Sequence, residues 1–517
     1  MSSENADESG DGVLTAGAAR ADITPDTGRP FQGYVRPDIR AEGVATRLFA
    51  RALVLNGSGG DEKVSLVSAD LLFGIDKDEV LSRVRSLGFT QESVLYAGTH
   101  THAATDAGEW TAAQVAEAIR GADANRKPAV AGWGTATVED VNQNRAPEAH
   151  LANHGKDLAP GEGSPDLDPC GPDHPRETKV RVLRVDATDG EPIAAWSGFP
   201  VHPTAFTPHN TVYSADLVGA AVRSFSDLIP TADTSAPVVL FGNGAEGDLI
   251  SLYDDYNQHA LADSLGERLA DGMIEAWEEA DGNLSPDIRV SSYGKRVKYE
   301  GQEVEPGKSV GSKAWFGLPF LGGGKNGPSF FYGLGLEGRR KPAWLSGEVH
   351  GRKIKVAPAP WGPEVEVQVV RLGSRLLLAV PGEPTVEMGR RTREAVAEVV
   401  PDGISDIAVV GLANGYNGYF TTPEEYDRQH YEGGHTVFGK HTEALVRQTH
   451  VELAALVGES DTEGEPTEED TETKRETPTE TEVDAPVGAQ TDGELLQEPT
   501  GPAERMSVVE VEWSGGP

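Results

Sequence analysis

Four stretches of the sequence place side chains with metal-binding chemistry directly after a short apolar run. S-V-L-Y-A-G-T-H-T-H ends in His100 and His102, and I-A-A-W-S-G-F-P-V-H ends in His202. L-L-L-A-V-P-G-E ends in Glu383, and I-A-V-V-G-L-A-N-G-Y-N-G-Y ends in Tyr416 and Tyr419. Two histidines and one glutamate are a recurrent ligand set for catalytic zinc, which keeps a further position open for water. These residue types therefore indicate a candidate zinc site.

The elements that must position these side chains are buried strands. The four apolar runs lack helical periodicity, which favours strands covered on both faces. Ligands of α/β sheets bind beyond the carboxyl ends of such strands. Helical spacing of apolar residues appears instead over 78–87, 110–120, 256–280, 384–400 and 439–457. The sequence thus predicts an α/β fold, with a mixed β-sheet core flanked by helices and the zinc site at the C-terminal ends of strands.

Seven motifs together resemble one enzyme family. They are A-R-A-D-I-T-P, R-L-F-A-R-A-L-V-L, T-H-T-H, N-R-A-P-E-A-H-L, V-H-P-T, P-G-E followed by M-G-R-R, and N-G-Y-N-G-Y-F-T-T-P-E-E-Y-D-R-Q-H-Y-E-G-G. In this order the motifs are similar to those of the neutral (non-lysosomal) ceramidases, from about Ala18 to about Val457. The resemblance implies a zinc hydrolase domain over 13–457. It also implies cleavage of the N-acyl amide of ceramide or a ceramide-like lipid to a fatty acid and a sphingoid amine.

The resemblance also implies a ligand set for one zinc ion per chain. The T-H-T-H and V-H-P-T motifs match the family's zinc histidines at His100 and His202. The P-G-E motif matches its zinc glutamate at Glu383, and the second tyrosine of N-G-Y-N-G-Y matches its fourth ligand at Tyr419. The first tyrosine of that motif, Tyr416, is expected to pack.

Further residues receive catalytic roles from the same resemblance. His102 is expected to carry a proton for the leaving amine or to stabilise the oxyanion, and the alternative is that it is another metal ligand. Arg145, in N-R-A-P, matches an arginine near the substrate, with a structural ion pair as the alternative. Tyr431, in Q-H-Y-E-G-G, matches a tyrosine that contacts the scissile amide, with ordinary packing as the alternative.

One motif departs from the family pattern. The family has G-D-V-S-P-N where this chain has G-D-L-I-S-L. With Gly247 and Asp248 aligned, the family serine corresponds to Ile250, and Ser251 lies one residue later. Asp248 and Ser251 are retained as catalytic candidates. We expect zinc-bound water, rather than a serine, to be the nucleophile.

Composition restricts the partners. The 517 residues carry 83 acidic and 45 basic side chains, a net charge of −38, so a phosphate backbone would be repelled and nucleic acid is excluded as a partner. Such a surface resembles that of proteins from halophilic microbes. The only cysteine is Cys170, so no intramolecular disulfide forms. No apolar run approaches the roughly 20 residues that span a bilayer, which predicts no integral membrane segment.

The chain ends are expected to be acidic tails. Residues 1–12 and 458–517 have the low hydrophobicity and high charge of disordered segments, and the second tail could end in a short strand. This leaves no room for the C-terminal immunoglobulin-type domain that the family usually carries. The polar N-terminus lacks the features of a secretion signal, so the predicted location is cytoplasmic.

Three other interpretations stay open at this point. H-x-H on a strand also occurs in two-metal amidohydrolases built on a (β/α)₈ barrel. A catalytically silent binding protein with the same fold would agree with the missing serine. A hydrolase of another N-acyl amide would keep the mechanism and change the substrate. The apolar, glycine-rich segments 314–323 and 328–336 could line a groove for an acyl or sphingoid chain.

Overall fold

An eight-stranded mixed sheet forms the centre of the computed structural model. The model describes residues 13–462 apart from 35, 37, 59–62, 75, 157–174, 232–235 and 253–257. Cys170 and the predicted N-terminal tail, 1–12, therefore lie outside the described residues. The predicted C-terminal tail, 458–517, lies outside them from residue 463 onwards. The sheet has the order β11-β9-β8-β6-β1-β3-β4-β5. Its strands are β1 (Thr15–Asp22), β3 (Phe49–Asn56), β4 (Lys63–Ala69), β5 (Val94–Gly98), β6 (Lys127–Thr137), β8 (Lys179–Ala187), β9 (Pro192–Phe199) and β11 (Val238–Asn243).

Both edges of this sheet are parallel pairs, whereas its middle is antiparallel. β4 pairs with β5 and β9 pairs with β11 in the parallel sense, and the strands between them alternate in direction. This confirms the predicted mixed sheet, and it differs from the all-parallel (β/α)₈ barrel of the two-metal amidohydrolases.

One face of the large sheet is covered by helices. Side chains alternate between the two faces of a strand, so Val182 of β8 faces α4 (Asp216–Leu228) and α5 (Gln258–Ala280), while Leu183 faces the other way. At the other end of the strand order, α1 (Lys77–Val84) and α2 (Glu109–Ala124) cover β3 and β4.

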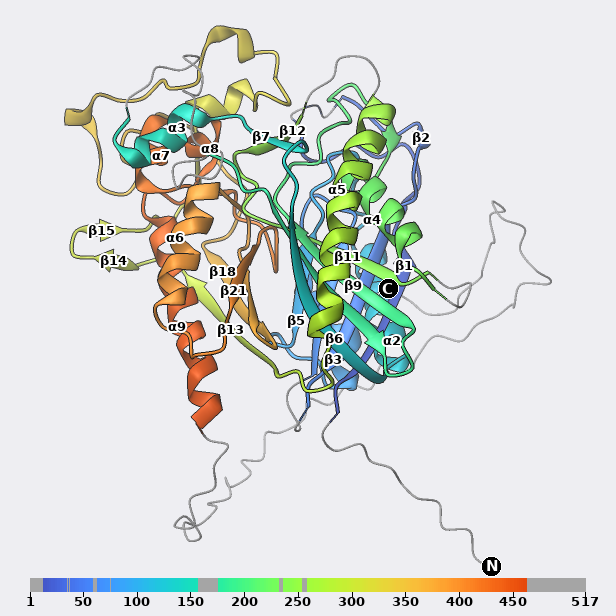
Figure 1. The fold of residues 1–517 in the computed structure, drawn as a ribbon. Helices are drawn as coiled ribbons and strands as arrows, with labels where there is room; N and C mark the ends of the chain where they lie inside the picture. Colours follow the sequence, from blue (N-terminus) through green and yellow to red (C-terminus); the bar gives the residue numbers. More distant parts are fainter. Residues whose placement is uncertain are drawn as a thin grey trace, which may run out of the picture. The chain divides into compact units, whose positions relative to one another are not determined.

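The other face packs on a second, four-stranded sheet. Its order is β13-β18-β19-β21, with bounds Val290–Lys298, Glu364–Leu372, Arg375–Ala379 and Asp406–Val410. Val370 and Leu377 of this sheet pack against Leu53 and Leu183 of the first. Its outer face is covered by α6 (Val386–Ala397) and α9 (Thr442–Thr462). The layers are therefore helix, sheet, sheet and helix, with α5 on one side and α6 and α9 on the other (Figure 1).

The two ends of the large sheet approach each other. Ser68 of β4 donates its hydroxyl to the carbonyl of Phe241 in β11 at 2.8 Å, and it accepts from the Phe241 amide at 3.2 Å. The loop after β5 is thereby brought to the loops after β9 and β11, although these strands lie at opposite ends of the strand order.

Short elements close this end of the fold. β20 (Glu383–Pro384) and β22 (Tyr419–Phe420) form a parallel pair that follows β19 and β21. The remaining short elements are β2 (Gly43–Val44), β7 (Asn142–Asn144), β10 (Val212–Tyr213), β12 (Leu249–Ser251), α3 (Pro147–Leu151), α7 (Pro423–Arg428) and α8 (Tyr431–His435).

A long excursion lies between β13 and β18, and its residues 313–355 form a cap over α3, α7 and α8, seen in yellow at the top of Figure 1. Its strands are β14 (Glu303–Glu305), β15 (Lys308–Ser309), β16 (Trp315–Gly317) and β17 (Lys355–Pro358). Between β16 and β17 it carries the 3₁₀ turns η4 (Leu318–Gly322), η5 (Tyr332–Leu334) and η6 (Ala343–Leu345). Among the described residues, no helix has the length and apolar character required to cross a membrane.

Candidate active site

His100 is held in a strained backbone conformation directly after β5. Its φ is 75°, a left-handed value that is uncommon for residues other than glycine and that clusters at functional sites. Its Nδ1 lies 2.8 Å from the carbonyl oxygen of Leu72. Because a carbonyl can only accept, Nδ1 carries the proton and the lone pair resides on Nε2, which is the tautomer required of a metal ligand.

His202 is oriented in the same way after β9. Its Nδ1 lies 2.8 Å from the carbonyl of Glu246 and 2.9 Å from that of Leu249. Its Nε2 therefore presents a lone pair to the site. The ring is fully buried, and this burial lowers its pKa to about 4, which keeps the imidazole neutral near pH 7. A neutral imidazole with a hydrogen-bonded Nδ1 is the usual form of a ligating histidine.

Asn243, at the end of β11, fixes the two histidine loops relative to each other. Its side-chain amide donates to the carbonyl of Thr99, next to His100, at 3.3 Å and to that of Val201, next to His202, at 2.7 Å. Its side-chain oxygen accepts from the Val201 amide at 3.0 Å. Asn243 is fully buried and has no access to water, so these bonds satisfy the polar atoms of its side chain.

Glu383 and Tyr419 complete a set of four converging atoms. Glu383 Oε2 lies 2.9 Å from His202 Nε2 and 3.3 Å from His100 Nε2. The Tyr419 hydroxyl lies 3.3 Å from His202 Nε2, and Tyr419 is opposite Glu383 in the β20–β22 pair. Two imidazole nitrogens, a carboxylate and a phenol oxygen fit a divalent metal such as zinc.

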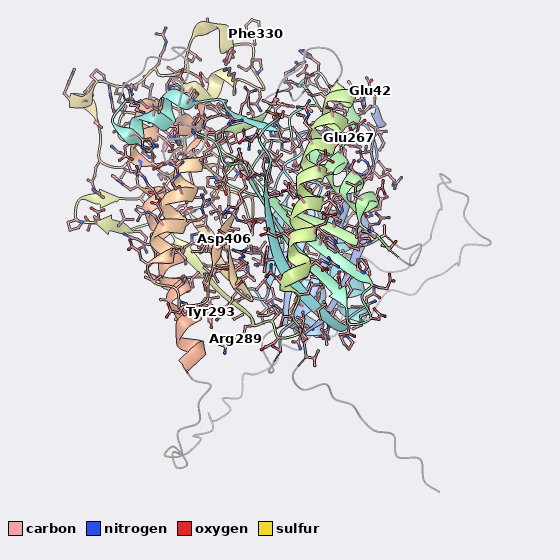
Figure 2. All side chains as sticks on the ribbon, viewed as in Figure 1. Glu42, Glu267, Arg289, Tyr293, Phe330 and Asp406 are labelled. Atoms are coloured by element: carbon pink, nitrogen blue, oxygen red, sulfur yellow. The ribbon has the colours of Figure 1, made fainter. Side chains whose placement is uncertain are left out.

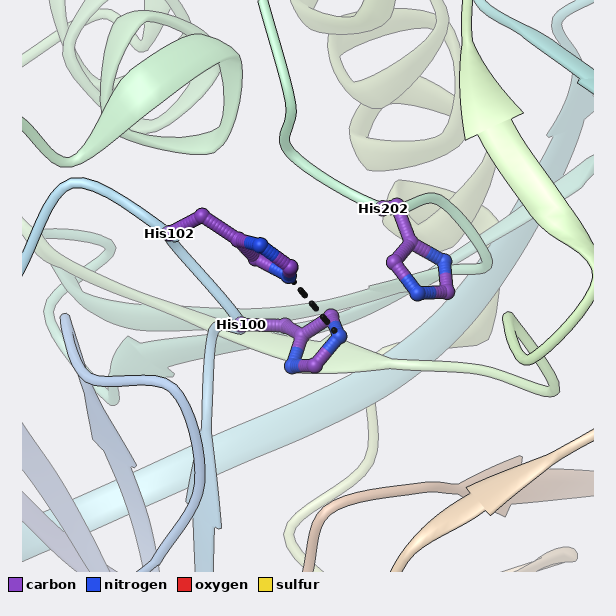
Figure 3. Close-up of side chains that lie close together, drawn as sticks. All are labelled: His100, His102 and His202. Carbon is purple, nitrogen blue, oxygen red and sulfur yellow. Dashed lines mark hydrogen bonds between the residues drawn. The ribbon is translucent and has the colours of Figure 1, made fainter. Parts of the chain in front are cut away.

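His102 faces the same point from two residues along the chain. Its Nε2 lies 3.4 Å from His100 Nε2 (Figure 3), and its ring packs edge-on against Tyr34. A side chain on Gly33 would meet the His102 ring at 2.6 Å, so only glycine allows this approach. His100, His102 and His202 also form a group whose ligand atoms lie within 4.8 Å of one another. Both interpretations of His102, as a proton carrier and as a ligand, therefore agree with its position.

Arg145 links the ligand set to the wall of the cavity. Its guanidinium donates to the Tyr419 hydroxyl at 2.9 Å, to Glu432 Oε1 at 2.7 Å, to Asn326 Oδ1 at 2.7 Å and to the Gly247 carbonyl at 2.8 Å. The side chain is buried, so the carboxylate of Glu432 provides its charge partner. Arg145 thus forms the predicted structural ion pair and also lies at the site.

A cavity of about 310 Å³ opens onto these residues. His100, His102, Arg145, Glu383 and Tyr419 lie at its polar end. Its other walls are largely aromatic and are formed by Tyr34, Phe73, Phe316, Phe320, Trp361, Tyr416, Tyr431 and His435. An apolar cavity with a few converging polar groups is suited to a ligand with a polar head and an apolar body. The 314–323 segment contributes to this wall, whereas the 328–336 segment does not.

Two predicted catalytic residues lie outside the described cavity lining. Asp248 accepts from the Val386 amide at the start of α6 at 2.9 Å and from the Asn144 side chain at 2.7 Å. Burial raises its pKa to about 7. Ser251 is buried in β12, where its hydroxyl lies 3.4 Å from that of Thr204. The structure thus brings seven of the nine predicted residues together and places these two behind the wall.

Sequence reasoning missed Glu246. It lies in the G-A-E-G-D turn after β11, is fully buried, and has no hydrogen-bond partner for either carboxylate oxygen among the described residues. Its ligand atom lies within 4.8 Å of those of His100 and Glu383. The signal that found the other residues, a polar side chain just after a buried strand, was present here too.

Tyr416 was expected to pack, and it also contacts a predicted ligand. Its hydroxyl donates to Glu383 Oε1 at 2.5 Å, while its ring stacks on Phe73. This bond leaves Glu383 Oε2 to face the histidines. Asn326 and Glu432, which fix Arg145, were missed because neither follows a strand.

Comparisons with known proteins agree on one family. The family model described as neutral/alkaline non-lysosomal ceramidase, N-terminal, matches residues 14–288 and 349–448. The chain is 29% identical to a neutral ceramidase of Mycobacterium tuberculosis over 94% of this chain and 83% of that protein. It is 27% identical to neutral ceramidase B of Dictyostelium discoideum over 89% of this chain and 75% of that protein.

Solved structures share the fold. The crystal structure of neutral ceramidase from Pseudomonas aeruginosa superposes with a TM-score of 0.73 at 23% identity, covering 87% of this chain and 75% of that one. A structure described as a ceramidase complexed with C2 gives a TM-score of 0.74 at 25% identity, covering 87% of this chain and 76% of the other.

Proposed function

The chain belongs to the neutral/alkaline non-lysosomal ceramidase family, a family of hydrolases, and on that premise we propose that it hydrolyses the amide bond of ceramide or a ceramide-like lipid. The products would be a fatty acid and a sphingoid amine. The observation that carries the proposal is the convergence of His100, His202, Glu383 and Tyr419, of which all but the fully buried His202 line the polar end of an aromatic cavity. Relatives named neutral ceramidases and a ceramidase solved with C2 support the substrate class.

The proposed cofactor is one zinc ion per chain, held by His100, His202, Glu383 and Tyr419. The donor set and the forced Nδ1–H tautomers support this assignment. When bound, zinc would supply a water of lowered pKa and polarise the scissile carbonyl. Glu383 keeps Oε2 towards the histidines because Tyr416 occupies Oε1.

The protein's own residues account for the rest of the reaction. In this proposal His102, whose Nε2 lies 3.4 Å from His100 Nε2, holds a proton and delivers it to the nitrogen of the leaving amine. Arg145 orients the Tyr419 oxygen through its 2.9 Å hydrogen bond. Tyr431 lines the cavity beside Tyr419, where its hydroxyl can contact the scissile amide, and the aromatic wall excludes water around the acyl and sphingoid chains.

The experiment that tests the proposal is fatty-acid release from a panel of N-acyl amides that includes ceramide. Assays run in molar salt, with and without a chelator followed by zinc add-back. Chelator-sensitive turnover of ceramide is the expected result. Turnover of simpler amides alone would keep the mechanism and replace the substrate. A folded, zinc-loaded protein without turnover would identify a silent binding protein.

Ser251→Ala is expected to keep ceramide turnover within about twofold of the unsubstituted protein. The Ser251 hydroxyl contacts Thr204 behind the cavity wall rather than the converging ligand atoms, and removal of one such neutral bond has a modest net effect of about 1 kcal/mol on stability. The measurement is kcat and KM on ceramide, with Tyr431→Phe as the comparison that should reduce kcat. A loss of more than about 100-fold in Ser251→Ala, the size expected when a catalytic donor is removed, would favour a serine nucleophile.

Glu246→Gln is expected to weaken metal binding by about tenfold or more while leaving the fold intact. Burial, and then the neighbouring Glu383, raise the pKa of Glu246 well above its usual range in the metal-free protein, so binding of a cation would release this proton. The resulting carboxylate, whose ligand atom lies within 4.8 Å of those of His100 and Glu383, would attract a divalent cation at roughly 5 Å by several kcal/mol even at an effective dielectric constant of about 20, and a glutamine cannot supply this attraction. The measurement is zinc affinity from competition with a chromophoric chelator. Glu278→Gln, at an exposed glutamate of α5, is the control, and equal affinities in the two variants would contradict the prediction.

A further inference from the structure

The cap, defined as residues 313–355, has the opposite charge balance to the rest of the chain. The whole sequence has 83 acidic and 45 basic residues. The cap has only two acidic residues, Glu337 and Glu348, and eight basic ones: Lys313, Lys325, Arg339, Arg340, Lys341, Arg352, Lys353 and Lys355. Lys353 is buried and donates to three backbone carbonyls, and the other seven are exposed or half-buried. A local positive surface on so acidic a protein indicates an anionic partner.

The cap also exposes large apolar side chains. Phe330 is 96% exposed and Trp344 is 81% exposed, and both lie in the turns around η5 and η6. Figure 2 shows Phe330 at the outermost edge of the cap. Phe331, Leu334 and Leu345 are exposed beside them. Aromatic residues next to basic ones are the composition of segments that lie at a membrane interface, where the rings enter the headgroup region and the cations meet lipid phosphates.

The exposed turns continue directly from the wall of the cavity. Phe316, Phe320, Gly323 and Gly324 line the cavity, and the chain then runs into Phe330. The Ser329 amide donates to the Gly322 carbonyl at 2.8 Å, which ties the exposed turn to the lining loop. A surface that binds the cap would therefore lie beside the same segment that forms the cavity wall.

We propose that the cap binds the surface of an anionic lipid bilayer. Phe330 and Trp344 insert among the headgroups, and the exposed basic side chains contact lipid phosphates. The choice of a bilayer rests in part on the proposed lipid-amide substrate, because a water-insoluble amide must reach the cavity from a membrane. The charge balance and the exposed aromatics are independent of that proposal. Residues 289–348, which include most of the cap, lie outside the match to the family model.

Binding is tested by flotation of the full chain with vesicles that contain no amide lipid, so that the outcome does not depend on turnover. One set contains phosphatidylglycerol with phosphatidylcholine, and the other contains phosphatidylcholine alone. At low salt, binding to the anionic vesicles is expected to be at least tenfold tighter. Phe330→Ser/Trp344→Ser and Lys325→Glu/Arg339→Glu are each expected to weaken it by at least tenfold. In 1 M salt, where the Debye length is about 3 Å, only the aromatic pair should still matter.

Two control variants lie outside the cap. Trp110→Ser removes an exposed tryptophan at the start of α2, and Lys298→Glu reverses an exposed charge on β13. Both should bind vesicles like the unsubstituted protein, and all variants should keep its thermal transition. The proposal is wrong if the unsubstituted chain ignores anionic vesicles, or if the cap variants bind them as well as the controls do. Sedimentation that changes from dimer to monomer in the cap variants, without vesicle binding, would instead make the cap a contact between copies.

Discussion

The His202→Ala variant is expected to lose almost all ceramide hydrolysis and to retain far less than one zinc ion per chain. His202 Nε2 contacts both Glu383 Oε2, at 2.9 Å, and the Tyr419 hydroxyl, at 3.3 Å. The variant therefore lacks one proposed ligand and also the contacts of that ligand with two others. Loss of an outer-shell partner alone typically costs about 10–100-fold in metal affinity or activity, and loss of a direct ligand should exceed that range. The measurements are zinc content by mass spectrometry and turnover with excess zinc.

The matched control for this variant lies in the same loop. His209 is exposed and hydrogen-bonds to Arg36 rather than to any proposed ligand, so His209→Ala should keep both zinc and turnover. A thermal melt of each variant beside the chelator-treated unsubstituted protein separates loss of metal from loss of fold. Full zinc content in a folded His202→Ala variant would overturn the proposed ligand set.

The Arg145→Met variant is expected to be destabilised by about 3–5 kcal/mol, because removing one partner of a buried ion pair leaves an uncompensated charge. That charge is the carboxylate of Glu432, which accepts from Arg145 at 2.7 Å and is itself buried. The free energy of unfolding is obtained from denaturant titration. Turnover should fall as well, since the Tyr419 oxygen loses its 2.9 Å donor.

A second variant distinguishes charge from packing at this position. Arg145→Met/Glu432→Gln removes both charges and is expected to regain most of the lost stability while remaining poorly active. Such recovery is the behaviour of a pair whose single variants suffer from an isolated charge. If the double variant is as unstable as the sum of two single losses, the contribution of Arg145 comes from its bonds to Asn326 and Gly247 instead.

The mixed fold and the zinc-site candidates were predictable because they obey local rules. A buried run of residues that ends in a polar side chain gave His100, His202 and Glu383, and the family resemblance added Tyr419, Arg145 and Tyr431. Each of these signals lies within a few residues of the strand that carries it. The structure confirms the α/β fold with a mixed sheet and brings these residues together.

What was not predictable depends on contacts between distant segments. The loops after β5 and β9 are connected by hydrogen bonds between distant segments. Ser68 donates to the Phe241 carbonyl, and Asn243 donates to the carbonyls of Thr99 and Val201. No periodicity in the sequence encodes such closure. The same limit applies to Asp248. Its place in the G-D-L-I-S-L motif does not indicate that its carboxylate accepts a hydrogen bond from the Val386 amide at the start of α6.

The separation of the converging residues along the chain determines when the proposed metal ion could be bound. His100 and His202 come from the large sheet, whereas Glu383 and Tyr419 come from the β20–β22 pair near the end of the folded part. A metal held by all four proposed ligands would therefore bind only after both sheets have formed, so that uptake of the proposed ion would follow folding rather than start it.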